Sequence, residues 1–150
     1  MDRKELAQEY FKKGYNCAQS VVMAFHDVTG LTEEESAKLA SSFGGGLGRL
    51  REVCGAVSGM AIVAGMLFGY GDPKVPGAVQ AHYALVQSLA GRFREKNGAI
   101  VCRELLGDRS APRTEPEPRT AEYYKKRPCV ELVGDAAEIL DFCLNERKEQ

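Results

Sequence analysis

The sequence lacks the marks of several well-known protein classes. Its formal net charge is only −1, and acids interrupt its Arg and Lys residues. A nucleic-acid partner is therefore not expected, because phosphate binding needs a basic excess or stripe. No two cysteines stand in a Cys-x-x-Cys pair, which excludes zinc-ribbon and bacterial ferredoxin spacings. No GK[ST] follows the glycine-rich segment, which excludes a Walker loop.

The start of the chain also lacks the signs of a secretory signal. Residues 1–5 are mostly charged and lead into an amphipathic segment, with no apolar run and no small-residue cleavage site. We therefore expect a cytoplasmic protein. In that compartment cysteines are more often reduced thiols, metal ligands or redox-active groups than permanent disulfides.

Signals for β-strands, hairpins and internal repeats are missing as well, and what is present predicts one all-α domain over residues 1–150. The chain is 44% hydrophobic and 27% charged, as in globular proteins that bury a core. Capping residues and helical periodicity predict a compact multi-helix bundle. The expected helices cover residues 2–13, 16–28, 32–43, 53–70, 77–96, 99–106, 120–126 and 128–147, with an exposed proline-rich loop over 108–119.

The segment 53–70 carries no charge and many small residues. A membrane span is the rival interpretation, because about 18 apolar residues is the lower limit for crossing a bilayer. The run barely reaches that limit, contains several glycines, and is flanked by amphipathic helices. We therefore predict that it forms the buried, glycine-rich central helix of the bundle and that the chain has no membrane span.

Four of the five cysteines share one kind of position. Cys17, Cys54, Cys102 and Cys129 each fall at or near a predicted helix start. Unpaired N–H groups and the helix dipole favour a thiolate there, and the thiolate is the form that attacks disulfides and binds metals. We therefore predict that these four form one redox or metal-binding site. Cys143 lies within the last predicted helix on an apolar face and is interpreted as a small core residue.

Other candidate residues are less informative. The loop Gly44–Gly48 with Arg49 and Arg51 has two interpretations: an anion site before the next helix, or a tight connection that lets helices and Cys54 approach closely. We favour the tight connection. His26 and His82 stand apart from any cysteine motif and are not expected to be ligands. A solvated helix face is predicted for the acids of the last helix: Glu131, Asp135 and Glu138.

Taken together, these residues resemble the C_GCAxxG_C_C family. The Cys-Gly-Ala-x-x-Gly core corresponds to residues 54–59, after Phe43-Gly-Gly-Gly-Leu-Gly-Arg-Leu-Arg-Glu-Val. Gly-Tyr-Asn-Cys17 resembles the first cysteine segment, Cys102-Arg-Glu-Leu-Leu-Gly the third, and Pro-Cys129 the fourth. The resemblance implies a domain of about this length with four characteristic cysteines and a redox role. Family members are often encoded near transporter genes, and related segments occur in multihaem redox proteins suspected of holding an iron–sulfur centre.

Three hypotheses about function stay open at this point. In the first, Cys17, Cys54, Cys102 and Cys129 bind an iron–sulfur cluster or another thiophilic metal for electron transfer. In the second, no metal is involved, Cys54 is the attacking thiolate and Cys17 its resolving partner. In the third, the protein is a non-catalytic helical interaction module linked to transport. The redox partner is not identified by the sequence, a homo-oligomer stays open, and no Cys-x-x-Cys-His haem attachment site is present.

Overall fold

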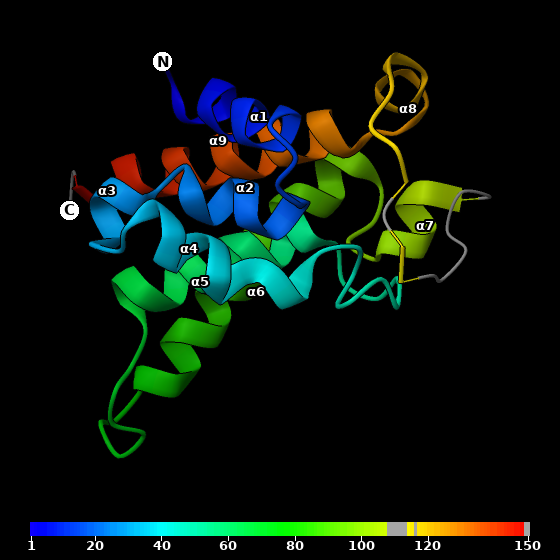
Figure 1. Cartoon of the computed structure of the whole chain (residues 1–150). Coiled ribbons are helices and arrows are strands. Elements are labelled where there is room, and N and C mark those ends of the chain that lie inside the picture. The colour runs from blue at the N-terminus through cyan, green and yellow to red at the C-terminus, as the bar shows by residue number, and fades with distance from the viewer. Residues whose placement is uncertain (108–113, 116, 149–150) are drawn as a thin grey trace.

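The computed structural model describes residues 1–107, 114, 115 and 117–148, and its fold is all-α as predicted (Figure 1). In the described part of the chain the β pairing is limited to one isolated bridge between Val53 and Val101. The helices are α1 (Arg3–Lys12), α2 (Cys17–Met23), α3 (His26–Thr29), α4 (Glu33–Ala40), the 3₁₀ helix η1 (Ser41–Phe43), α5 (Gly55–Phe68), α6 (Ala78–Asn97), α7 (Cys102–Leu106), α8 (Ala121–Lys126) and α9 (Cys129–Lys148).

Side-chain caps determine where several helices begin. The Asn16 side chain accepts from the N–H of Gln19 at 2.9 Å, and the Gln19 side chain accepts from the N–H of Asn16 at 3.0 Å. Thr32 and Glu35 form the same reciprocal capping box at the start of α4. The helix expected over residues 16–28 is divided instead into α2 and α3, and the one expected over 32–43 ends in the 3₁₀ turn η1.

The central position of α5 confirms the prediction made for the uncharged segment. This helix packs against α2, α6 and α9, while α1 lies along α9 (Figure 1). A Cβ added at Gly59 would lie 2.8 Å from the Cβ of Val21, so the glycine lets α2 and α5 approach closely. The core contains the fully buried side chains of Phe11, Phe25, Phe93, Met23, Met60, Leu140, Val21, Val22, Val63 and Val133.

One predicted surface residue is buried. Asp135 is 6% exposed and pairs with Lys96 of α6, whose Nζ lies 3.0 Å from the Asp135 Oδ1. The expectation of a solvated acidic face on the last helix is therefore wrong at this position. The cause is a long-range partner: α6 and α9 pack together, and the lysine brings a cation to the buried carboxylate.

Within the residues described, no helix is both long enough and apolar enough to cross a membrane.

Candidate functional site

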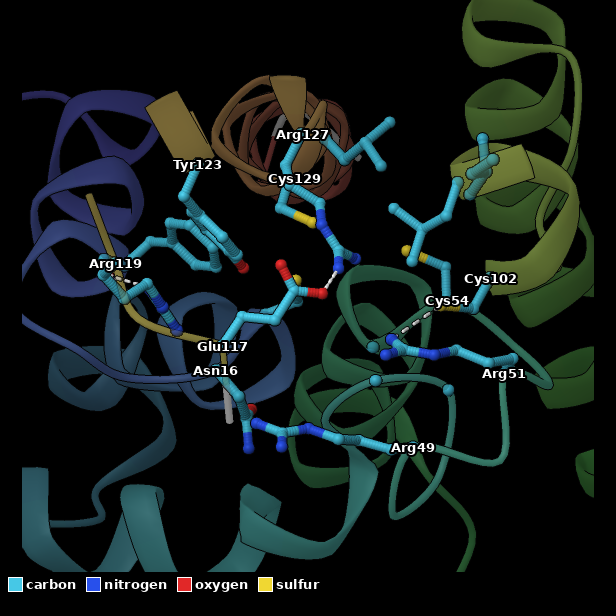
Figure 2. Close-up of a pocket in the computed structure, with 18 of the residues that line it drawn as sticks. Asn16, Arg49, Arg51, Cys54, Cys102, Glu117, Arg119, Tyr123, Arg127 and Cys129 are labelled. Atoms are coloured by element: carbon cyan, nitrogen blue, oxygen red, sulfur yellow. Dashed lines mark hydrogen bonds and ion pairs between the residues drawn. The ribbon is translucent and has the colours of Figure 1, made fainter. Parts of the chain in front are cut away.

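The four predicted site cysteines lie at four helix starts. Cys17, Cys102 and Cys129 are the first residues of α2, α7 and α9, and Cys54 is the residue before the first turn of α5. All four line one cavity with a volume of about 80 Å³, enough for several waters or a small ligand group. Figure 2 shows Cys54 and Cys102 together on one side of this cavity and Cys129 on another. Cys143 does not line it and is buried in α9.

Two of these cysteines form a thiol pair. Cys17 and Cys129, on α2 and α9, lie close enough for each side chain to shift the pKa of the other. The pKa of Cys129 is lowered to about 7, first by hydrogen bonding of its thiolate form to Cys17 and then by the cations Arg127, Arg119 and Arg51, while burial opposes the change. The same interaction raises the pKa of Cys17 well above its ordinary value, and burial raises it further. One thiolate is therefore favoured in the pair, and the arginines favour it on Cys129, with Cys17 as the protonated donor.

The other two cavity cysteines are neutral thiols. Burial raises the pKa of Cys54 to about 12, although the backbone amides of Ala56 and Val57 oppose the rise. Burial also raises the pKa of Cys102, and here Arg51 opposes it with an Nη1 that lies 3.8 Å from the Cys102 Sγ. A helix start lowers thiol pKa, as the sequence suggested, but at these two positions the loss of solvent outweighs that effect.

The glycine-rich loop places Cys54 beside Cys102. The N–H of Cys54 donates to the carbonyl of Ile100 at 2.7 Å, and the N–H of Cys102 donates to the carbonyl of Glu52 at 2.5 Å. Gly46 has φ +74°, and a Cβ there would lie 2.8 Å from the Cys102 Cβ. Only glycine tolerates both constraints, which supports the tight-connection interpretation of this loop.

The opposite wall consists of residues that the sequence did not identify. The described part of the predicted loop over 108–119 includes Glu115, Glu117 and Arg119, and all three line the cavity. Arg119 is half-buried: it donates to the carbonyls of Phe11 at 2.6 Å and Tyr15 at 3.0 Å, and its guanidinium lies over the Phe11 ring. Three prolines indicated an exposed loop, whereas the contact partners of Arg119 lie about a hundred residues earlier in the chain. Residues 108–113 and 116 lie outside the described part.

A second group of missed residues surrounds the start of α9. Arg127 is buried and forms an ion pair with Glu117, shown as a dashed line in Figure 2. Tyr123 of α8 also lines the cavity, and burial raises its pKa to about 12, so its phenol stays protonated. Pro128 indicated the helix start, but nothing local to the sequence shows that the preceding arginine is buried.

The types of side chain in the cavity suit a metal, but among the described residues their positions do not form a ligand group. Four cysteines are the ligand set of many iron–sulfur and zinc sites. In the part of the chain that the structure describes, however, no three or more His, Cys, Asp or Glu side chains are grouped as metal ligands.

The fold and the site define a helical protein with four cysteines around one arginine-rich cavity. The chain belongs to the C_GCAxxG_C_C family, whose model, described as "Putative redox-active protein (C_GCAxxG_C_C)", matches residues 15–142. An uncharacterized protein of Archaeoglobus fulgidus is 27% identical over 153 residues, which cover 97% of this chain and 95% of that protein. No solved structure matched.

Proposed function

We propose that this protein carries out thiol–disulfide redox chemistry, with Cys17 and Cys129 cycling between a dithiol and a disulfide. The observation that carries the proposal is the placement of Cys17 and Cys129 in one cavity, where the Cys17 side chain and the nearby arginines favour the thiolate form of Cys129. The family description supports a redox role at the level of class. A cytoplasmic location belongs to the same proposal, because reducing thiols there would return the disulfide to the dithiol.

The reaction follows from the different states of the two sulfurs. The Cys129 thiolate attacks one sulfur of a substrate disulfide, forms a mixed disulfide and expels the other substrate sulfur as a thiolate. Cys17 then gives up its proton to the first departed substrate thiolate and attacks the Cys129 sulfur. The second substrate thiolate leaves, and a Cys17–Cys129 disulfide remains. Two electrons have passed from the cysteine pair to the substrate, and an external thiol restores the pair.

The attacking role in this proposal differs from the sequence-based hypothesis, which assigned it to Cys54. A thiol with a pKa of about 12 is almost fully protonated at neutral pH, so Cys54 is a poor nucleophile in this environment. We infer that Cys129 attacks and that Cys17 keeps its predicted role as the resolving partner. Cys54 and Cys102 then remain as neutral thiols in the cavity wall.

Thiol counting after mild oxidation tests this proposal. All five cysteines are free thiols in this structure. We expect oxidation to remove two thiols, peptide mapping to place the disulfide between Cys17 and Cys129, and a thiol reductant to restore the count. Cys129→Ser should abolish the change, while Cys143→Ser, the matched control, should retain it. An unchanged count, or a disulfide between other cysteines, would contradict the proposal.

A metal centre is the second candidate, and one observation favours it. Cys17, Cys54, Cys102 and Cys129 line the same cavity, and their thiolates would hold an iron–sulfur cluster or another thiophilic metal that supplies electron transfer. The arginines of the cavity would offset the negative charge of such a centre.

Anaerobic reconstitution separates the two candidates. The metal hypothesis expects bound iron or zinc in metal analysis, visible absorption in the case of an iron–sulfur cluster, and loss of both in Cys54→Ser but not in Cys143→Ser. The dithiol proposal expects no stoichiometric metal and a normal thiol cycle in Cys54→Ser.

A further inference from the structure

Arg51 differs from the other arginines of the cavity in having no oxygen partner for its guanidinium among the described residues. Arg119 donates to two backbone carbonyls, Arg127 is paired with Glu117, and Arg49 donates to the Thr114 carbonyl at 3.1 Å. The Arg51 side chain has one contact of this kind, from Nη1 to the Cys102 Sγ at 3.8 Å. Its Nε is buried without a hydrogen-bond partner.

This arginine is also deeply buried and lines the cavity. Only 7% of Arg51 is exposed, and Figure 2 shows its guanidinium at the cavity, next to Cys102. A buried guanidinium without a carboxylate is costly, because desolvation of a cation is normally offset by an anion or by full hydrogen bonding. Its planar fork of N–H donors is suited to carboxylate, sulfonate and similar oxyanion groups.

The surroundings of Arg51 add to the positive charge. The cavity lining contains four arginines and two glutamates, Glu115 and Glu117, which leaves an excess of two positive charges before any cysteine ionises. Arg51 itself has φ +63°, a left-handed conformation that costs a non-glycine residue about 1 kcal/mol or more. Its backbone is retained in this conformation by hydrogen bonds from the Arg51 N–H to the Gly45 carbonyl and from the Arg103 N–H to the Arg51 carbonyl.

We propose that Arg51 is the cation of an anion subsite in the four-cysteine cavity, and that this cavity selects small electrophiles that carry an oxyanion group. The substrate class rests on the proposed function, since the subsite would hold an anionic disulfide next to the Cys17–Cys129 pair. Arg51 is a binding residue in this scheme, and the cysteines perform the chemistry. The glycine-rich loop then has two roles, because the same backbone that brings Cys54 to Cys102 also directs Arg51 inward.

Methanethiosulfonate reagents that differ in charge test the subsite on the reduced full-length protein. A cysteine thiolate displaces methanesulfinate from such a reagent and keeps the other sulfur fragment as a mixed disulfide. The probes are the sulfonatoethyl (anionic), trimethylammonioethyl (cationic) and methyl (neutral) methanethiosulfonates, with peptide mass mapping to record which cysteines react. We expect the cavity cysteines to react about tenfold faster with the anionic than with the cationic reagent at low salt. Because Cys143 is buried outside the cavity, the reference is the ratio of rates that the same reagents show with a small free thiol.

Two Arg51 variants and a competing anion test whether Arg51 causes the preference for the anionic reagent. Arg51→Gln should reduce the anionic preference to about twofold or less, Arg51→Lys should retain most of it, and the exposed Arg94→Gln, with the same change in net charge, should leave it unaltered. Sulfate, at constant ionic strength, should slow modification of the cavity cysteines by the neutral reagent in the wild-type protein. This competition needs no variant, so it tests the subsite even if Arg51→Gln fails to fold.

The outcomes distinguish this inference from the proposed function. Equal rates for anionic and cationic reagents, no protection by sulfate, or the same preference in a small free thiol would overturn the subsite. None of these results depends on disulfide formation between Cys17 and Cys129. Conversely, a normal anion preference without that disulfide would overturn the dithiol cycle and leave the subsite intact.

Discussion

The pKa of Cys129 depends first on Cys17, and removing that thiol should change the reactivity of Cys129 in a characteristic way. The hydrogen bond from Cys17 is the largest cause of the lowered value of about 7, against an ordinary value of 9.0. A hydrogen bond to a charged group contributes about 1.5–3 kcal/mol, or roughly one to two pKa units. Because the cavity arginines remain in Cys17→Ala, we expect the pKa of Cys129 in this variant to rise to about 8 to 8.5.

The magnitude of the rate change at pH 7 is smaller than this shift suggests. The thiolate fraction falls about tenfold, from roughly one half to roughly 5%. A thiolate of higher pKa is a stronger nucleophile, however, and a Brønsted coefficient of about 0.4–0.5 returns roughly a factor of four. Cys17→Ala should therefore react only about two- to threefold more slowly at pH 7, and about fourfold faster above pH 9.5. The rate profiles of the two proteins should cross.

Both rate profiles, of the wild-type protein and of Cys17→Ala, can be measured by iodoacetamide labelling of Cys129 from pH 5.5 to 10. Peptide mass mapping follows the labelling, and the conditions are reducing and anaerobic. Thiolate absorbance near 240 nm gives an independent titration. Cys143→Ala is the matched control and should reproduce the wild-type midpoint near 7. If Cys17→Ala leaves the Cys129 midpoint unchanged, the hydrogen-bonded pair is not what stabilises the thiolate, and the assignment of attacking and resolving roles is refuted.

Two further predictions concern the scaffold, and thermal or urea unfolding checks both. Gly59→Ala should destabilise the protein by about 2 kcal/mol, because the new Cβ would lie 2.8 Å from the Val21 Cβ. Gly65 is also helical but has open space around it, so Gly65→Ala should raise the free energy of unfolding by up to about 1 kcal/mol. Equal effects of the two substitutions would contradict the close approach of α2 and α5. Lys96→Met should lower the free energy of unfolding by about 2 kcal/mol, because it leaves Asp135 buried without its cation. The loss is smaller than for a fully buried ion pair because Lys96 is half exposed. The exposed Lys125→Met is the control, and a cost no larger than the control's would show that the ion pair does not stabilise the fold.

The helices and the positions of the cysteines within them could be predicted because their signals are local. Asn16 and Thr32 cap helices with partners three residues away, and Gly98, in the left-handed region at φ +87°, ends α6. Such features depend on short stretches of chain, so the periodicity and the capping residues were sufficient. The boundaries that were missed, such as the division after Met23, depend on packing between helices.

The pairing of the cysteines could not be predicted in the same way. Cys17 and Cys129 are separated by most of the chain, and only the packing of α2 against α9 brings them together. Arg119 and Arg127 were missed for the same reason. Arg119 stands in a proline-rich segment, a composition that indicates an exposed loop when no tertiary contacts are known. Arg51 was noted in the glycine-rich segment, but its burial beside Cys102 depends on long-range contacts.

Four cysteines at equivalent helix positions therefore have different chemistry, and the difference follows from what surrounds each sulfur. At Cys54 the first turn of α5 offers backbone amides, but burial outweighs them and the thiol stays protonated. At Cys129 burial also opposes the charge, yet a thiol donor and three nearby arginines more than offset it. A position at a helix start therefore does not by itself decide the charge of a cysteine in this cavity, because burial, hydrogen bonding and nearby cations differ between the sites. This asymmetry is what the proposed stepwise reaction requires: a thiolate that attacks, a protonated thiol that resolves, and an arginine without a carboxylate partner among the described residues that would bind an anionic electrophile.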